Sequence, residues 1–317
     1  MTGPGPIASG RFSHDLLLHD GHNELVDGIR AYVDQGLESG GQVVVHGAEG
    51  DLATIREAVG SHPRLEYALT GDLFPTPMKA LFATQRRLAE SPDPVELWAA
   101  GSAPPIDDRA SRISWTRFES LINEVLAPYA FHALCTYDTQ TLSARTIAAG
   151  KATHPCISSG GCRTSSPDYL APAEFLTTPL AGVPGPPGSR PAVTLTLYSA
   201  RDLNRARQLV ARSAVSFGAL PLSSIDGFVS ALNEVLVNGL DHGGTPVQLA
   251  LWAEPTRLTC RVLDDGPGIP DPLAGCRYPE PSGPKGLWLA RQLCEDVYAR
   301  NLPGALGGGC SVVLTAT

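Results

Sequence analysis

The sequence lacks several features that would place it in common classes of protein. No apolar run reaches the roughly 20 residues that a helix needs to cross a bilayer, so we expect no membrane span. The first residues, MTGPGPIASGRFSHD, lack the basic start and apolar core of a signal peptide, which predicts a cytoplasmic protein. The 24 Lys and Arg residues are outnumbered by 32 Asp and Glu, so we expect no direct binding of nucleic acid.

The length and the cysteine content set further bounds. A chain of 317 residues fits two domains better than one or three, and 43% apolar residues suffice to fill ordinary cores. The seven cysteines are an odd number and are scattered, which in a reducing compartment predicts free thiols. Cys156 and Cys162 lie close in sequence, but no second pair accompanies them. We therefore expect two free thiols rather than a disulfide or a metal site.

The first half of the chain alternates apolar strands with helical patterns. Continuous apolar strands separated by helices predict a mostly parallel sheet that is covered on both faces. The strand candidates are 15–19, 42–46, 95–100 and 131–137, and the helical patterns lie near 23–39, 51–59, 76–90, 111–127 and 140–150. This alternation indicates one α/β domain over 11–162.

Two further regions follow. Residues 163–192 contain seven prolines, including the run GVPGPPGSRP, and we interpret them as a partly polyproline-like linker. Residues 193–317 form a second domain in which helices cover one face of a mixed sheet. Its expected strands are 193–198, 247–252, 257–263, 297–300 and 310–316, and its expected helices are 201–217, 224–241 and 286–295.

The helix expected over 224–241 carries a carboxylate and an amide on one face. Glu234 and Asn238 are four residues apart, so their side chains lie about one turn from each other. Such a pair can share a metal ion and a water or hydroxyl group, although an isolated pair is more often a solvated polar strip. Ser223 and Asp226 fit a capping box at the start of this helix.

Two glycine-containing motifs come later in the same domain. The first is Asp264-Asp265-Gly266-Pro267-Gly268, directly after an apolar strand, which places the Asp264 carboxylate at the strand end beside a backbone that can approach a flat ligand. Alone, it would read as an ordinary acidic turn. The second is Gly283-Pro284-Lys285-Gly286-Leu287, which runs into a helix whose free N–H groups suit phosphate.

Together, the three motifs resemble the N, G1 and G2 boxes of the GHKL ATPase superfamily. The resemblance covers about 193–317 and is greatest to the short ATPase domain of anti-sigma-factor serine kinases. It implies the Bergerat fold, an α/β sandwich that binds Mg²⁺ and ATP beneath a lid, here 269–285. By this resemblance, Asn238 binds Mg²⁺ and phosphate, Glu234 is the general base and Asp264 binds the adenine amino group. Gly266 and Gly268 shape the adenine pocket, and the phosphates lie against Gly283, Lys285, Gly286 and Leu287.

The first domain resembles the MEDS sensory domain over about 11–160, through RFSHDLLLHDGHNELVDGIRAYVDQGLESGGQVVVH, SWTRFESLINEVL and FHALCTYD. That family implies a RecA-like α/β fold. No glycine-rich loop with Lys and Ser or Thr follows a strand, so we expect no nucleotide hydrolysis here. A metal site among His14, His19, His22 and His46 fits no zinc spacing, and we expect histidines at the surface or in loops.

The two resemblances together predict a cytoplasmic signalling regulator. We expect a sensory domain joined to a serine/threonine protein kinase of the anti-sigma-factor type. Its implied partners are a STAS-type antagonist, which it phosphorylates, and a sigma factor, and the family often forms homodimers. One alternative is a non-catalytic module that binds ATP and sequesters a partner. Another is a sensor histidine kinase, but the Pro-rich segment replaces the long histidine-bearing helix of that class.

Overall fold

The computed structural model describes residues 12–74, 76–91, 96–102, 109–159, 162–182, 188–280, 282–302 and 309–317. The chain divides into two compact units, Met1–Gly182 and Val183–Thr317. Among the described residues, no helix is both long and apolar enough to cross a membrane.

The first unit is built on a seven-stranded sheet in the order β3-β2-β4-β5-β1-β6-β7. Every neighbouring pair is parallel except β6 and β7. The predicted, mostly parallel sheet is thus confirmed, although β3, β6 and β7 were not expected. The strands are β1 (Phe12–His19), β2 (Gln42–Gly47), β3 (Leu65–Leu69), β4 (Leu97–Ser102), β5 (Phe131–Asp138), β6 (Cys156–Ser159) and β7 (Cys162–Ser165).

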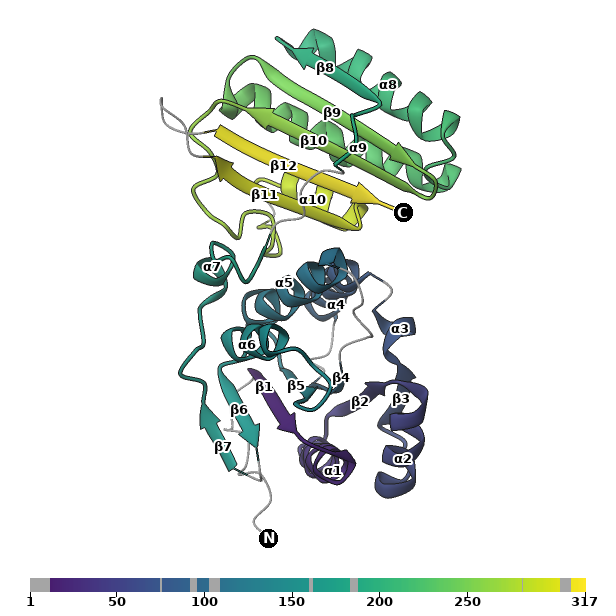
Figure 1. The fold of residues 1–317 in the computed structure, drawn as a ribbon, viewed down its shortest axis with the longest axis vertical. Coiled ribbons are helices and arrows are strands. Elements are labelled where there is room, and N and C mark those ends of the chain that lie inside the picture. The colour runs from purple at the N-terminus through teal and green to yellow at the C-terminus, as the bar shows by residue number, and fades with distance from the viewer. Residues whose placement is uncertain are drawn as a thin grey trace. The chain divides into compact units, whose positions relative to one another are not determined.

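Helices cover both faces of this sheet (Figure 1). Helices α1 and α2 share an apolar core with one face, where Ile29, Val33 and Ile55 are buried against Val45 and Trp98. Helices α4, α5 and α6 lie together on the other side. The helices are α1 (His22–Glu38), α2 (Glu49–Val59), α3 (Thr70–Leu73), α4 (Pro77–Glu90), α5 (Arg109–Val125), α6 (Ala144–Thr153) and α7 (Pro172–Phe175).

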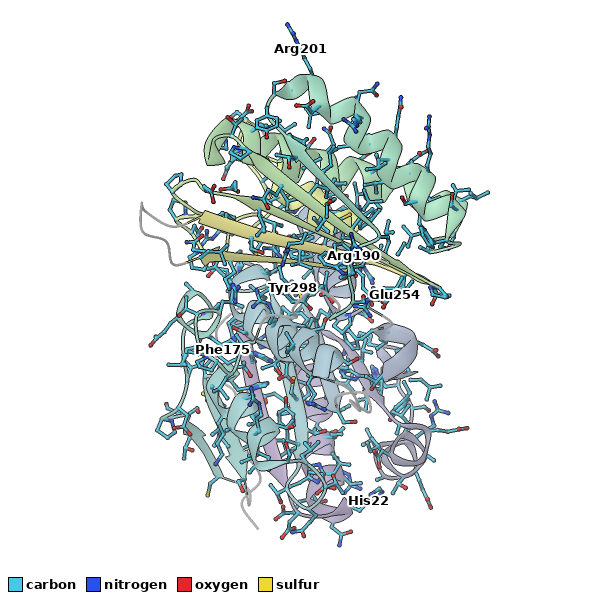
Figure 2. The ribbon with its side chains drawn as sticks, turned by 45° about the horizontal axis from the view of Figure 1, so that its top comes forward. His22, Phe175, Arg190, Arg201, Glu254 and Tyr298 are labelled. Carbon is cyan, nitrogen blue, oxygen red and sulfur yellow. The ribbon has the colours of Figure 1, made fainter. Side chains whose placement is uncertain are left out.

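The first unit extends to Gly182, beyond the predicted boundary at residue 162. Strand β7 pairs with β6, and α7 buries Phe175 in a small core with Ala152 and Ala181. Figure 2 shows Phe175 among the side chains of this unit. The first part of the expected linker is therefore structured, because Phe175 and its neighbours supply apolar anchors between the prolines. The linker was interpreted as partly polyproline-like, and its residues 183–187 lie outside the described residues.

The second unit contains a five-stranded sheet in the order β11-β12-β10-β9-β8. Every pair is antiparallel, so the expectation of a mixed sheet was wrong. Two consecutive helices connect β8 to β9. The chain reverses direction at the start of each helix and again at the start of β9, so β9 runs antiparallel to β8. The strands are β8 (Val193–Leu197), β9 (Val247–Glu254), β10 (Arg257–Asp264), β11 (Asp296–Leu302) and β12 (Gly309–Ala316).

Three helices pack on one face of this sheet, which gives the predicted two-layer sandwich (Figure 1). They are α8 (Leu203–Ser216), which follows a short turn η1 (Ala200–Asp202), α9 (Leu222–Asn238) and α10 (Gly286–Leu293). Helix α9 buries Phe228, Leu232 and Leu236 in the core. The capping box expected at Ser223 and Asp226 is wrong, because the helix begins at Leu222 after Pro221 and has no side-chain cap. Proline already fixes the entry, and Ser224 N–H bonds to the Pro221 carbonyl.

The buried position of Phe175 gives a test of the extended first unit. Phe175→Ala should lower the free energy of unfolding by about 3–5 kcal/mol, because it empties a fully buried site between α7 and α6. Urea denaturation of the full chain, followed by circular dichroism, measures this loss. Leu69→Ala, at an exposed site of the same unit, is the control and should stay within about 0.5 kcal/mol of wild type. A similar small effect of Phe175→Ala would place residues 172–182 outside the unit.

Candidate functional site

Glu234 and Asn238 lie near the C-terminal end of α9, on the side that faces the start of α10. Both side chains are half-buried, one turn apart, as their spacing predicts. After Asn238 the helix widens into a π-turn, η2 (Gly239–Gly243). Such single π-turns are frequent at functional sites. Here the turn carries Gly243 toward the end of β10.

Asp264, the last residue of β10, is held by close backbone contacts. Its Oδ1 accepts the Gly266 amide at 3.0 Å, and a Cβ on Gly243 would overlap its carboxylate. A Cβ on Gly266 would in turn overlap the Gly243 backbone. Burial raises the pKa of Asp264 above its ordinary value, against the hydrogen bonds from the Gly266 and Cys310 amides, which lower it. The carboxylate is therefore a buried acceptor in a fixed position.

Gly268 follows in a conformation that a side chain would strain. Its φ is 82°, and a Cβ there would lie 2.6 Å from Oδ1 of Asn301 on β11. The Asn301 side chain holds the next residue, because it accepts the Ile269 amide at 2.7 Å and donates to the Ile269 carbonyl at 2.9 Å. The loop thus leaves the sheet along a fixed path. Sequence reasoning missed Asn301, since a polar residue on an edge strand carries no distinguishing signal.

The N-terminus of α10 faces the polar end of α9. A Cβ on Gly286 would lie 2.9 Å from Oε2 of Glu234 and 3.5 Å from Nδ2 of Asn238. Glycine at this position therefore lets the first turn of α10 approach both side chains. The first-turn N–H groups of a helix have no partner within that helix and form the positive end of its dipole. This end of α10 suits an anion held close to Glu234 and Asn238.

These elements enclose a cavity of about 650 Å³. Its volume lies within the range of small-molecule sites, about 300–1,000 Å³. Among its lining residues are six of the predicted site residues, Asn238, Asp264, Gly268, Gly283, Gly286 and Leu287. The three motifs, which span about fifty residues of sequence, therefore meet around one space.

Three predicted residues do not line the cavity. Gly266 packs against the Gly243 backbone, and Glu234 lies beside Gly286. Lys285 precedes α10 and its side chain is exposed. The structure does not bring the Lys285 ammonium into the cavity, because the residue caps the helix rather than entering its first turn. Its phosphate-binding role stays a prediction.

The expected lid, 269–285, borders the cavity and is tied down at several points. Asp271 accepts from Arg277 at 2.7 Å, and the rings of Tyr278 and Trp288 meet edge to face at 5.6 Å. The buried Arg291 of α10 donates to the Ala274 carbonyl of this segment. None of these partners was predicted, since their charges and rings become a pattern only when the segment folds over α10.

The histidines of the first unit correct another expectation. His22 is exposed, but His14, His19 and His46 are buried. The surface or loop placement expected for these three was wrong, because they belong to β1 and β2 and both faces of this sheet are covered. Cys156 and Cys162 are free thiols, as predicted.

Comparison with protein families agrees with both units. The family model described as MEDS, the MEthanogen/methylotroph, DcmR Sensory domain, matches residues 13–155. The model of the histidine kinase-like ATPase domain matches residues 198–314. No curated protein matches the chain.

The glycine contacts around Asp264 give a test of the site's construction. Gly243→Ala should destabilise the second unit, since its Cβ has no room beside the Asp264 carboxylate. Gly227→Ala is the matched control in α9, where the nearest atom to the new Cβ is 3.6 Å away. That change should stabilise the helix by about 0.5–1 kcal/mol. Urea denaturation of both variants measures the effects, and a neutral Gly243→Ala would contradict the packing described here.

Proposed function

We propose that the protein acts as an anti-sigma-factor-like serine/threonine protein kinase. The match to a MEDS sensory domain followed by a histidine kinase-like ATPase domain supports a signalling regulator that binds ATP. Its substrate in this proposal is a Ser or Thr of a STAS-type antagonist, and its second partner is a sigma factor. The observation that carries the proposal is the single cavity where Asn238, Asp264 and the start of α10 meet.

The residues around the cavity fit Mg²⁺ and ATP. Asp264 offers a buried acceptor for an exocyclic amine, and Gly268 lines the same cavity. Gly283, Gly286 and the free N–H groups of α10 suit phosphates. The Asn238 side-chain oxygen is a ligand type that Mg²⁺ accepts, since this ion takes few protein oxygens and keeps several waters.

In this proposal Glu234 is the general base. Mg²⁺ and ATP, when bound, supply an electrophilic γ-phosphoryl group and a leaving ADP. The Glu234 carboxylate lies at the start of α10, where it can accept the proton of an incoming Ser or Thr hydroxyl. Asn238, on the same helix face, would bind Mg²⁺ and the phosphate oxygens. The phosphate-binding N–H groups stay in place, because α10 is anchored through Arg291 to the Ala274 and Val297 carbonyls.

The placement of the histidines favours an external hydroxyl over an internal phosphoacceptor histidine. His132 lies within β5 and is buried, and His154 directly follows α6 with no exposed surface. The next histidine along the sequence is His242, in the π-turn at the cavity. The described part of 155–202 contains no long helix that could present a histidine to a second protein.

A sensory role for the first unit draws support from its own cavity. A space of about 600 Å³ is lined by His19, Gly47, Ser102 and Asp138, each at the carboxyl end of its strand. Ligands of α/β proteins bind outside the carboxyl ends of parallel strands. The first unit thus offers a ligand site of ordinary size.

Nucleotide binding is tested by changing the polarity of one side chain. Asp264→Asn replaces an acceptor oxygen by an amide that donates, so it should weaken ATP binding at least tenfold, about 1.4 kcal/mol. Asp265→Asn, at the exposed neighbouring position, is the matched control and should bind as wild type. Calorimetric titration of the full chain with ATP and Mg²⁺ measures both. Equal binding by Asp264→Asn and wild type would remove Asp264 from the site.

Phosphoryl transfer is tested separately from binding. Glu234→Gln should keep ATP affinity but slow transfer to a STAS-domain substrate about 100-fold or more, because the amide cannot accept the hydroxyl proton. Glu254→Gln, at the exposed end of β9, is the control. Radiolabelled ATP follows the transfer. If wild type binds ATP and retains a partner without transferring phosphate to any candidate antagonist, the alternative of a non-catalytic, partner-sequestering module replaces the kinase.

A further inference from the structure

Three potential metal ligands from separate segments meet inside the first unit, away from both cavities described above. They are His14 on β1, Cys135 on β5 and His154 directly after α6, and their ligand atoms all lie within 4.8 Å of one another. His14 Nε2 lies 3.5 Å from Cys135 Sγ, and the two imidazole centroids are 4.0 Å apart. Strands β1 and β5 are parallel neighbours with His14 opposite Ala133, so His14 and Cys135 project from the same face of the sheet.

A hydrogen-bond network fixes the protonation of the His14 ring. Asn123 Nδ2 donates to the Thr153 carbonyl at 2.7 Å and to the Ser120 carbonyl at 3.2 Å, so its Oδ1 faces His14 Nδ1 at 3.2 Å. Because this oxygen only accepts, Nδ1 of His14 carries the hydrogen. The lone pair of His14 Nε2 is therefore directed at Cys135.

The same argument applies to His154. Its Nδ1 donates to the Gly150 carbonyl at 2.7 Å, which leaves the lone pair on Nε2. This Nε2 is buried and has no hydrogen-bond partner among the described residues, and the side chain has no exposed surface. A buried acceptor without a partner destabilises the folded state. The orphaned atom thus points to a ligand that completes it.

Without an ion, burial keeps the two imidazoles neutral and the thiol protonated. Burial lowers the pKa of His14 well below its ordinary value, and the neighbouring His154 lowers it further. Burial also lowers the pKa of His154 to about 4, so both imidazoles are neutral near pH 7. The Cys135 thiol has a pKa raised by burial and by the charges of Glu119 and Asp15, so it keeps its proton unless a cation replaces it.

The nearby acids are engaged elsewhere and do not add ligands. Glu119 accepts from Tyr137 Oη at 2.6 Å and from Trp115 Nε1 at 2.9 Å. Asp15 forms a bidentate pair with Arg163, at 2.6 and 3.1 Å. The ligand set is two imidazole nitrogens and one thiolate. This set favours softer transition metals over Mg²⁺ and Ca²⁺, which prefer oxygen.

We propose that the first unit binds one d¹⁰ transition-metal ion, Cu⁺ or Zn²⁺, through Nε2 of His14, Nε2 of His154 and Sγ of Cys135. With Zn–N of about 2.05 Å and Zn–S of about 2.3 Å, a tetrahedral ion separates N and S by about 3.6 Å. The observed separation of 3.5 Å matches this value. On binding, the thiol loses its proton to solvent and a sulfur–metal bond forms. Cu⁺ makes the three-ligand site neutral, whereas Zn²⁺ leaves one positive charge on it.

Metal titration of the full chain tests the site. Protein that is reduced and stripped of metal should bind one equivalent of Zn²⁺ or of Cu⁺, with release of one proton. Separate titrations distinguish the two ions. Co²⁺, used as a spectroscopic probe, should produce a thiolate-to-cobalt charge-transfer band in the near ultraviolet. Either ion bound at one equivalent supports the proposal. Wild-type protein that binds neither ion and gives no thiolate band overturns it, without reference to any variant.

Variants assign the ligands. Cys135→Ser should abolish the charge-transfer band, and His154→Gln should weaken metal binding at least tenfold. Asn123→Leu, which removes the partner of His14 Nδ1, should weaken binding about 10–100-fold. Cys162→Ser and His22→Gln, at exposed positions of the same unit, are matched controls and should bind as wild type. Circular dichroism verifies the fold of each variant. Folded Cys135→Ser and His154→Gln proteins that both bind metal like wild type would contradict the assigned site.

Discussion

The candidate site of the second unit depends on the contact between the Asp264 carboxylate and the glycines around it. Gly243 lies against this carboxylate, Gly266 lies against Gly243, and the Gly266 amide donates to Asp264. These contacts join the π-turn that follows α9 to the end of β10. The two segments are not adjacent in the sequence. Because a Cβ at Gly243 or Gly266 would separate them, the cavity requires glycine at both positions. The orientation of Asn238 relative to Asp264 follows from this contact.

Much of this arrangement was predictable from local patterns. The apolar stripe of α9 gave the helix and the direction of Glu234 and Asn238, since residues four apart share a face. The strand before Asp264 and the glycines before α10 were equally legible. The antiparallel β8–β9 pair was also within reach, because two helices between strands imply it. The start of α9 was not, since the Ser223 and Asp226 pattern competes with Pro221, and only the folded backbone decides between them.

Other features depend on which elements become neighbours, and no local pattern contains that. The buried His14 and His154 are 140 positions apart and meet only because β1 lies between β5 and β6, the strand that follows α6. Asn301 holds Ile269 across 32 positions. Phe175 fixes a helix within a proline-rich segment whose composition alone indicated a linker. In each case, polar or aromatic side chains meet a partner that the local sequence does not specify.

The two units present opposite ligand chemistry, which determines how they respond to the same ionic environment. The site of the second unit offers amide and carboxylate oxygens and helix N–H groups, a set that accepts Mg²⁺ with phosphate. The cluster of the first unit offers imidazole nitrogen and sulfur without an available carboxylate, a set to which Mg²⁺ binds poorly. Millimolar Mg²⁺ therefore leaves the histidine–cysteine cluster open to a d¹⁰ ion, and an ion bound there does not compete for the nucleotide site. Hardness of the donor atoms thus keeps the two binding events chemically independent.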